Sequence, residues 1–429
     1  MTLSPWLIEL QRDRPIQKLE GRTEAQVTII GGGISGMSTA YYLLKETPYS
    51  IALVEKNMVG HGASGHNGGQ GIAGLERPLS ELVHEKGART VAELLWEMEG
   101  GYQLIEELCG TVGYRGVKVD DKGIVGFQDE PALERALEDI ALRTKIGAPT
   151  REFVIADDLP PDLKLPQTIH GLIRRATRGE ISREMRSKDM YLACMTVPVI
   201  LLNSAQLCED IAAHLLAAYP DRFRLFEGSQ VGKVDAGGLV KVSTPEGSIA
   251  SEKVVLCTNG YPVPRVLSSR RTSVEDRSRQ FLASMIAYRP EGTDRTGAFI
   301  YNHYGGNTEE EPYFYLTRRP TRYGNAELVA VGGPQILIAG EPGGDQEIPP
   351  GVYERIDDFV SRTYEPKLPD FPELYWNGLM GYTQDGLRMV GPDPKVPQVW
   401  YNLGCNGIGL LPSVVGGRRL ASMMNGSKD

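Results

Sequence analysis

The residues best suited to chemistry in this chain form two glycine-rich stretches that follow one another closely. The first, GGGISG, places Gly31, Gly33 and Gly36 at G-x-G-x-x-G spacing. In such a run the first glycine allows a tight turn, the second lets backbone approach a pyrophosphate, and the third lets a helix pack on a strand. Glu55 follows about 20 residues later, where a ribose hydroxyl would need an acceptor. This spacing predicts a dinucleotide-binding site.

The second stretch, GASGHNGGQGIAG at residues 62–74, contains six glycines and one imidazole, His66. Glycine loses more conformational entropy on folding than other residues, so such a cluster indicates that backbone must pass close to another group. The imidazole can contact a bound ligand, or it can simply hydrogen-bond to the surrounding loop. The residues themselves leave both interpretations open.

The sequence also predicts the strands and the helix that must position these stretches. Residues 26–30 (QVTII) and 50–54 (SIALV) are short apolar runs, which predict buried strands. Between them, MSTAYYLLKE places apolar residues on one helical face. The pattern is strand, glycine turn, helix, strand and acid. A helix that begins at the glycine turn would direct free N–H groups and a partial positive charge at phosphates.

Two later segments have the same character. Residues 254–261 (VVLCTNGY) read as a buried strand with a polar turn, and they follow a hairpin-like stretch with turns at GG and PEG. Near the C-terminus a strand, VWYNL, precedes the glycine loop GCNGIG and a helix expected to start near Pro412. We therefore expect a dinucleotide site assembled from three separated segments.

Composition excludes several other classes of function. The chain has 429 residues, a net charge of −9 and no long basic run, so we expect no nucleic-acid partner. Its five widely spaced cysteines and six histidines lack metal-ligand spacing, which predicts reduced thiols and no metal site. It contains no stretch of about 18 apolar residues and no secretory signal pattern. These features predict a cytoplasmic protein without a membrane span.

The chain resembles the FAD-dependent D-amino-acid-oxidase superfamily, and within it the γ-glutamylputrescine oxidoreductase and glycine–sarcosine oxidase types. The motifs that carry the resemblance are VTIIGGGISG with Glu55, GASGHNGGQ, VVLCTNGY, the W-x-G-x-x-x-x-T-x-D run at residues 376–385, and GCNGIG at residues 404–409. It implies an α/β fold in which a Rossmann-like FAD-binding domain is joined to an α+β substrate domain built on an antiparallel sheet. The implied boundaries are an N-terminal extension at 1–24, the FAD-binding domain at 25–78, 199–262 and 375–429, and the substrate domain at 79–198 and 263–374.

The resemblance also implies the residues that contact FAD. In chain order these are Gly31, Gly33, Ile34, Ser35, Gly36, Glu55, Lys56, Gly62, Ala63, Ser64, His66, Asn67, Gly68, Gly69, Gln70, Val231, Thr258, Asn259, Gly260, Gly381, Asn406, Gly407, Ile408 and Gly409. The backbone of Val231 would meet the adenine, and N–H groups of residues 407–409 would stabilise charge on the reduced flavin. Some relatives bond a histidine matching His66 covalently to the flavin 8α-methyl group, whereas others carry arginine and bind FAD non-covalently. Both alternatives remain for His66.

The sequence gives fewer indications of the substrate than of the cofactor. Relatives of the glycine oxidase type hold a carboxylate with an arginine in a W-x-G-L-R-P run, and the matching residue here is Met380. Cys405 and Asn406 stand where a second arginine is expected. Because a bidentate guanidinium is the usual carboxylate clamp, these differences disfavour a simple α-amino acid. Arg318 or Arg319 could replace the clamp, or they could be surface residues at the end of a hairpin.

Aromatic residues gather in two groups, which are Tyr301, His303 and Tyr304, and Tyr313, Phe314 and Tyr315. They could hold an amine through cation–π attraction or simply pack in a sheet. Tyr301, Tyr315 and Met380 are the candidates for the substrate pocket. The acidic run at residues 309–311 could attract a cationic amine or be a solvated loop.

These observations predict an FAD-dependent oxidoreductase that oxidises the C–N bond of a small-molecule amine. The expected substrate is a secondary amine or a γ-glutamylated polyamine, and the electron acceptor is O2, a quinone or a protein. An oxidase or dehydrogenase for sarcosine, proline or D-amino acids is one alternative. A flavin-binding protein without oxidase activity is another.

Overall fold

The computed structural model describes most of the chain. The described residues are 3–75, 77–159, 165–261, 263–276, 278–291, 294–301, 313–323, 326–338 and 350–426. His303, Tyr304 and the acidic run at 309–311 lie outside them. Within these ranges, every helix is too short or too polar to cross a membrane.

A six-stranded sheet carries the first glycine motif. Its strand order is β20 (Met389–Pro392), β21 (Val399–Leu403), β13 (Lys253–Leu256), β2 (Val27–Ile30), β3 (Ile51–Val54) and β9 (Phe223–Phe226). All pairs are parallel except the one between β20 and β21. The central strands β2 and β3 are buried at every position, as expected for a parallel sheet covered on both faces. The α/β fold class predicted from the sequence is confirmed.

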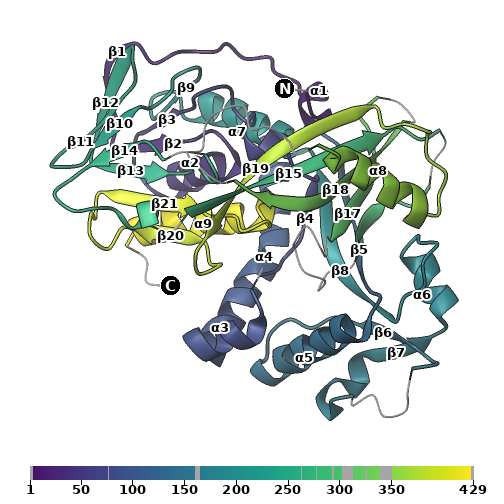
Figure 1. Cartoon of the computed structure of the whole chain (residues 1–429). Helices are drawn as coiled ribbons and strands as arrows, with labels where there is room; N and C mark the ends of the chain where they lie inside the picture. Colours follow the sequence, from purple (N-terminus) through teal and green to yellow (C-terminus); the bar gives the residue numbers. More distant parts are fainter. Residues whose placement is uncertain are drawn as a thin grey trace.

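Successive side chains of β2 point to opposite faces of this sheet and pack against different layers. Val27 and Ile29 pack in one core with residues of the helices α2 (Ile34–Glu46), α7 (Ser204–Ala218) and α9 (Leu410–Met424). Ile30 packs in another core with residues of a five-stranded sheet. The strand order of that sheet is β1 (Gly21–Glu24), β12 (Gly247–Ser251), β11 (Val240–Ser243), β10 (Lys233–Asp235) and β14 (Arg265–Leu267). The three layers form one side of the molecule in Figure 1.

A ten-stranded, mainly antiparallel sheet forms the other side of the molecule (Figure 1). Its strands run in the order β19 (Leu374–Thr383), β15 (Ser278–Tyr288), β18 (Glu327–Leu337), β17 (Phe314–Pro320), β16 (Gly297–Tyr301), β5 (Lys118–Phe127), β8 (Ala193–Leu202), β6 (Phe153–Ala156) and β7 (Ile173–Ala176), and β4 (Gln70–Gly71) pairs with β8. β19 belongs to this sheet, although the predicted boundary at residue 375 counts nearly all of it with the FAD-binding domain.

The remaining helices lie around these sheets. They are α1 (Pro5–Ile8), α3 (Leu79–Lys86), α4 (Ala88–Val112), α5 (Glu130–Ile146), α6 (Arg178–Glu184) and α8 (Val352–Thr363), with 3-10 turns η1 (Ala63–Gly65), η2 (Gln167–Leu172) and η3 (Ser273–Asp276). Figure 1 shows the N-terminal segment running along the outside of the molecule from α1 to β1.

Candidate functional site

A cavity of about 1050 Å³ takes its walls from both large sheets. The carboxyl ends of β2, β3 and β13 contribute one wall, and β15, β17, β18 and β19 contribute the opposite one. Most of the residues predicted from the sequence line it, namely Gly31, Gly33, Ile34, Ser35, Glu55, Lys56, Gly62, Ala63, Ser64, His66, Asn67, Gly68, Gly69, Gln70, Val231, Thr258, Asn259, Tyr315, Met380, Gly407, Ile408 and Gly409. The fold therefore brings all three predicted segments to one site.

The first glycine motif has the backbone geometry that its spacing requires. Gly31 has a φ of +110°, and a side chain there would lie 2.6 Å from the carbonyl oxygen of Cys257. A Cβ atom at Gly36 would lie 1.9 Å from the carbonyl oxygen of Gly31, so Gly36 supports the turn from behind the cavity wall. Gly33 is the N-cap of α2, and the next amide, that of Ile34, donates to Ser64 Oγ at 2.9 Å. The first turn of α2 therefore lines the cavity through Gly33, Ile34 and Ser35, with the Ser64 hydroxyl at its N-terminus.

Glu55 lies directly after β3 and holds the same turn. Its Oε2 accepts a hydrogen bond from the Gly32 amide at 2.7 Å, and its Oε1 accepts one from the Asn57 amide at 2.9 Å. Burial raises the pKa of the Glu55 carboxyl above its usual value. Each carboxylate oxygen can accept a second hydrogen bond, so Glu55 can still accept from a ribose hydroxyl.

His66 lines the cavity with its imidazole held in one orientation. Its Nδ1 lies 2.9 Å from the carbonyl oxygen of Gly62. Because a carbonyl only accepts, Nδ1 carries the proton and Nε2 keeps its lone pair. Burial lowers the pKa of His66, and burial with the nearby Arg12 lowers the pKa of His61 to about 4. Both imidazoles are therefore neutral at pH 7.

These depressed pKa values predict a loss of stability in mild acid. The unfolded chain binds a proton at His61 near pH 6.5, whereas the folded chain resists it down to about pH 4. The free energy of unfolding should therefore fall as pH falls through this window, by on the order of 1 kcal/mol for this half-buried group. Urea unfolding of wild type and His61→Gln at pH 7 and pH 5, with saturating FAD, measures it. An equal pH dependence in both proteins would contradict the assignment.

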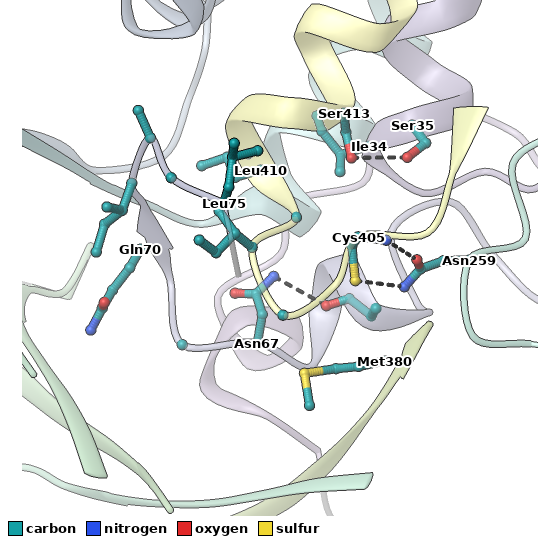
Figure 2. Close-up of a pocket in the computed structure, with 18 of the residues that line it drawn as sticks. Ile34, Ser35, Asn67, Gln70, Leu75, Asn259, Met380, Cys405, Leu410 and Ser413 are labelled. Carbon is teal, nitrogen blue, oxygen red and sulfur yellow. Dashed lines mark hydrogen bonds between the residues drawn. The ribbon is translucent and has the colours of Figure 1, made fainter. Parts of the chain in front are cut away.

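The C-terminal glycine loop also presents backbone to the cavity. Gly407 and Ile408 precede Gly409, the N-cap of α9, which has no side-chain capping bond. Asn259 fixes this loop, because its Oδ1 accepts from the Cys405 amide at 3.0 Å and its Nδ2 contacts Cys405 Sγ at 3.2 Å (Figure 2). The helix N-terminus therefore supplies partial positive charge to a ligand in the cavity.

One buried polar atom in the wall is without a partner. Thr258 Oγ1 is inaccessible and meets no hydrogen-bond partner among the described residues. Buried hydroxyls are normally paired, so this one fits a site that a ligand completes. The glycine turn, the two helix N-termini and this hydroxyl together fit the phosphates and ribose of FAD.

The strands opposite the glycine turn form what we call the roof, which consists of Ala283, Tyr313, Tyr315, Gln335, Gly378 and Met380. Tyr382 donates to Gln335 Oε1 at 2.6 Å, and Gln335 Nε2 donates to the Tyr313 hydroxyl at 2.8 Å. The Met380 side chain is drawn among the lining residues in Figure 2. The roof residues carry no charged side chain.

Several predicted residues do not line the cavity. Gly36, Gly260, Gly381 and Asn406 lie behind the wall, where a Cβ atom at Gly260 would lie 2.6 Å from the Met380 backbone. The prediction for Tyr301 as a substrate-pocket residue is wrong. Its side chain is fully buried in the core of the large sheet, and its hydroxyl donates to the Met185 carbonyl oxygen at 3.1 Å.

Both interpretations of the two hairpin arginines are also wrong. Arg318 is buried and pairs with Glu327 at 2.6 Å. Arg319 is fully buried, pairs with Glu9 at 2.7 Å and lies over the Trp6 ring. Neither is a surface residue, and neither lines the cavity.

Sequence reasoning missed the part played by the N-terminal segment. Trp6 is fully buried and its Nε1 donates to the Asn67 carbonyl oxygen at 2.5 Å. Its ring also lies 2.5 Å from where a Cβ atom of Gly69 would be, so the second glycine stretch wraps around it. The signal was present in the Ser-Pro pair, since Ser4 caps α1 and Pro5 begins it.

Part of the cavity lining is charged, which the sequence did not indicate. Arg151 lines the cavity and pairs with Glu99, and Arg143 pairs with Asp139 at 2.6 Å. These pairs lie on α4, α5 and the segment after α5, far along the chain from both glycine stretches. They join the site only because α4 and α5 contact one another.

Comparison with known proteins agrees with this geometry. A family model described as FAD dependent oxidoreductase (DAO) matches residues 26–423. The protein named "Probable oxidoreductase OrdL" of Haemophilus influenzae is 25% identical over 252 residues, which are 58% of this chain and 51% of that protein. Gamma-glutamylputrescine oxidoreductase of Escherichia coli is 29% identical over 106 residues, 25% of each chain. These alignments thus span about half the length of the first relative and a quarter of the length of the second.

Solved structures show the same fold. Glycine oxidase from Geobacillus kaustophilus superposes with a TM-score of 0.67 at 18% identity, covering 95% of this chain and 96% of that one. L-proline dehydrogenase from P. horikoshii gives a TM-score of 0.65 at 14% identity, covering 97% and 95%. The family match extends over most of the chain and includes every segment of the cavity wall described above. The chain therefore belongs to the DAO family of FAD-dependent oxidoreductases.

Proposed function

We propose that this protein binds FAD in the cavity and oxidises the C–N bond of an amine, either a secondary amine or a γ-glutamylated polyamine. One relative that matches over a quarter of its length is named gamma-glutamylputrescine oxidoreductase. Residues 25–78, 199–262 and 375–429 form the proposed FAD-binding domain, and the other large segments form the substrate domain. The electron acceptor, which is O2, a quinone or a protein, and the cytoplasmic location stay predictions.

The uncharged roof is the observation that carries the choice of substrate. Met380 occupies the position where the resemblance leads us to expect a carboxylate-binding arginine, and Tyr315 and Tyr313 lie nearby in the same wall. Arg318 and Arg319 are committed to buried ion pairs elsewhere. A carboxylate placed against this roof would lose its hydration without gaining a cationic partner from it. An amine with an apolar α-carbon could instead lie against the tyrosine faces.

The chemistry follows from what each component can supply. Bound FAD supplies a hydride acceptor. The tyrosine and methionine side chains of the roof would orient the α-carbon and exclude water. The substrate amine enters neutral and loses hydride from its α-carbon, which leaves an iminium ion, the protonated imine. Water then hydrolyses this ion to a carbonyl compound and a protonated amine. No strong base is required from the protein for this sequence, because the amine nitrogen is already deprotonated.

The role of His66 is a separate proposal with two forms. Its Nε2 has a free lone pair, so it can contact the flavin or form a covalent bond to the 8α-carbon. Acid precipitation of the purified protein distinguishes the two forms. Yellow colour in the pellet that disappears in His66→Gln would establish the bond. Colour only in the supernatant would leave His66 as a contact residue.

Anaerobic reduction of the flavin tests the proposed reaction. γ-Glutamylputrescine, or a secondary amine without a carboxylate, is expected to bleach the oxidised flavin absorption. Bleaching by sarcosine, proline or D-amino acids alone would replace the proposal with the amino-acid alternative. Absence of bleaching by any amine would favour a flavin-binding protein without oxidase activity.

A single substitution should move the specificity. Met380→Arg places a guanidinium in the roof, where it can form charge-assisted hydrogen bonds to a carboxylate. We expect kcat/KM for sarcosine relative to γ-glutamylputrescine to rise about tenfold or more, from the 1.5–3 kcal/mol typical of such bonds. Met380→Leu is the matched control and should leave the ratio nearly unchanged. An unchanged ratio in Met380→Arg would place the substrate away from this residue.

A further inference from the structure

Arg388 lies just before β20 with its guanidinium against the first turn of the glycine-motif helix. Its Nη2 donates to Ser35 Oγ at 3.1 Å and to Asn402 Oδ1 at 2.7 Å. Its Nε and Nη1 are inaccessible and have no hydrogen-bond partner among the described residues. The ion pairs formed by those residues include none with Arg388.

Without a bound ligand, this position is energetically unfavourable for the Arg388 guanidinium. A buried cation normally pairs with an acid, because leaving it unpaired forfeits its hydration without compensation. Burial accordingly lowers the pKa of Arg388. The other buried arginines that we have described, Arg318 and Arg319, each have a glutamate partner. Arg388 is thus placed as though its counter-ion were supplied by a bound group.

A chain of hydroxyls leads from Arg388 to the cavity. Because Arg388 donates to Ser35 Oγ, the Ser35 hydroxyl must donate onward, and Ser413 Oγ lies 2.9 Å away (Figure 2). Ser35 and Ser413 both line the cavity, in the first turns of α2 and α9. The two helix N-termini and the guanidinium therefore direct positive charge toward one place.

We infer that Arg388, acting through Ser35 and Ser413, is a positioning residue for the pyrophosphate of FAD. Ser35 belongs to the GGGISG turn, so the part of FAD nearest to the Ser35 and Ser413 hydroxyls is the diphosphate rather than the flavin ring. The inference rests on the FAD site proposed above and does not depend on the substrate.

The test is FAD affinity of the full chain, measured in a His66→Gln background so that a covalent flavin cannot interfere. Arg388→Met is expected to weaken FAD binding about tenfold or more, because a charged hydrogen-bond donor is lost. In titrations in which ADP displaces FAD, the affinity for ADP should fall by a similar factor. The affinity for adenosine, which has no diphosphate, should not change. Arg388→Lys should restore part of the affinity. Arg418→Met, which removes an exposed charge from α9, is the matched control.

The apoprotein gives a second readout that a purely structural arginine would not produce. Removing an unpaired buried cation should leave the melting temperature of the FAD-free chain unchanged or higher, while the increase caused by FAD becomes smaller. Unchanged binding of FAD and ADP to Arg388→Met would overturn the inference, and so would a loss of adenosine binding equal to that of ADP. Failure of the wild-type chain to bind FAD would instead refute the proposed site.

Discussion

Replacing Gly36 with alanine is expected to abolish FAD binding and to lower the yield of folded protein. The new methyl group would lie 1.9 Å from the carbonyl oxygen of Gly31, which is a backbone atom and cannot rotate away. Either α2 must move off β2 or the turn at Gly31 must open, and both changes displace the amides at the N-terminus of α2. We expect a destabilisation of about 3 kcal/mol. Urea unfolding and the flavin content of the purified protein measure the two effects.

Gly110→Ala provides the matched control for this substitution. Gly110 lies on the exposed side of α4, and a Cβ atom there would meet nothing within 4 Å. Alanine in a helix should stabilise the protein by about 0.5–1 kcal/mol and leave its flavin content unchanged. If Gly36→Ala behaved like Gly110→Ala, the close packing of α2 on the glycine turn would be refuted.

Trp6→Ala is expected to have the second largest effect, although α1 is far from the glycine turn in the sequence. The indole fills the centre of the loop at residues 65–69 and covers Arg319. Its removal leaves a large cavity, uncovers the buried ion pair of Arg319 with Glu9, and frees the Asn67 carbonyl group. We expect a destabilisation of about 4 kcal/mol, with weaker flavin retention because the loop carries His66.

Two further variants separate the contributions of the indole. Trp6→Phe keeps an aromatic ring but loses the bond to Asn67, so it should show a smaller loss than Trp6→Ala. Leu3→Ala changes an exposed neighbour and should remain within about 0.5 kcal/mol of wild type. Differential scanning fluorimetry with and without FAD measures all three. Equal melting temperatures for Trp6→Ala and Leu3→Ala would show that the N-terminal segment does not support the loop.

The fold around the first glycine motif could be predicted because its determinants are local. The apolar runs that became β2 and β3, the glycines of the turn and Glu55 are all within about 30 residues, which is the size of one βαβ unit. The three-segment cavity could be predicted because each segment has the same strand-then-glycine pattern. The spacing of these local motifs therefore predicted most of the residues that line the proposed FAD site.

The errors concern residues whose surroundings come from distant parts of the chain. Tyr301 and Tyr315 are similar aromatic residues in adjacent strands, yet only Tyr315 faces the cavity. The strand pattern gives alternation but not which face a distant helix covers, and here Phe359 of α8 packs on the Tyr301 ring. Arg319 was misjudged for the same reason, since its partner Glu9 is more than 300 residues away in the sequence.

The pairing of β13 between β2 and β21 has a consequence for the order in which the protein matures on the ribosome. The strand that precedes GGGISG can pair with β3 early, but it acquires its second neighbour, β13, only after residue 253 has been synthesised, and α2 is joined by α9 only after residue 410. The nascent N-terminal half therefore lacks two walls of the cofactor pocket. We therefore expect FAD to bind only after most of the chain has been synthesised, rather than to act as an early template for folding.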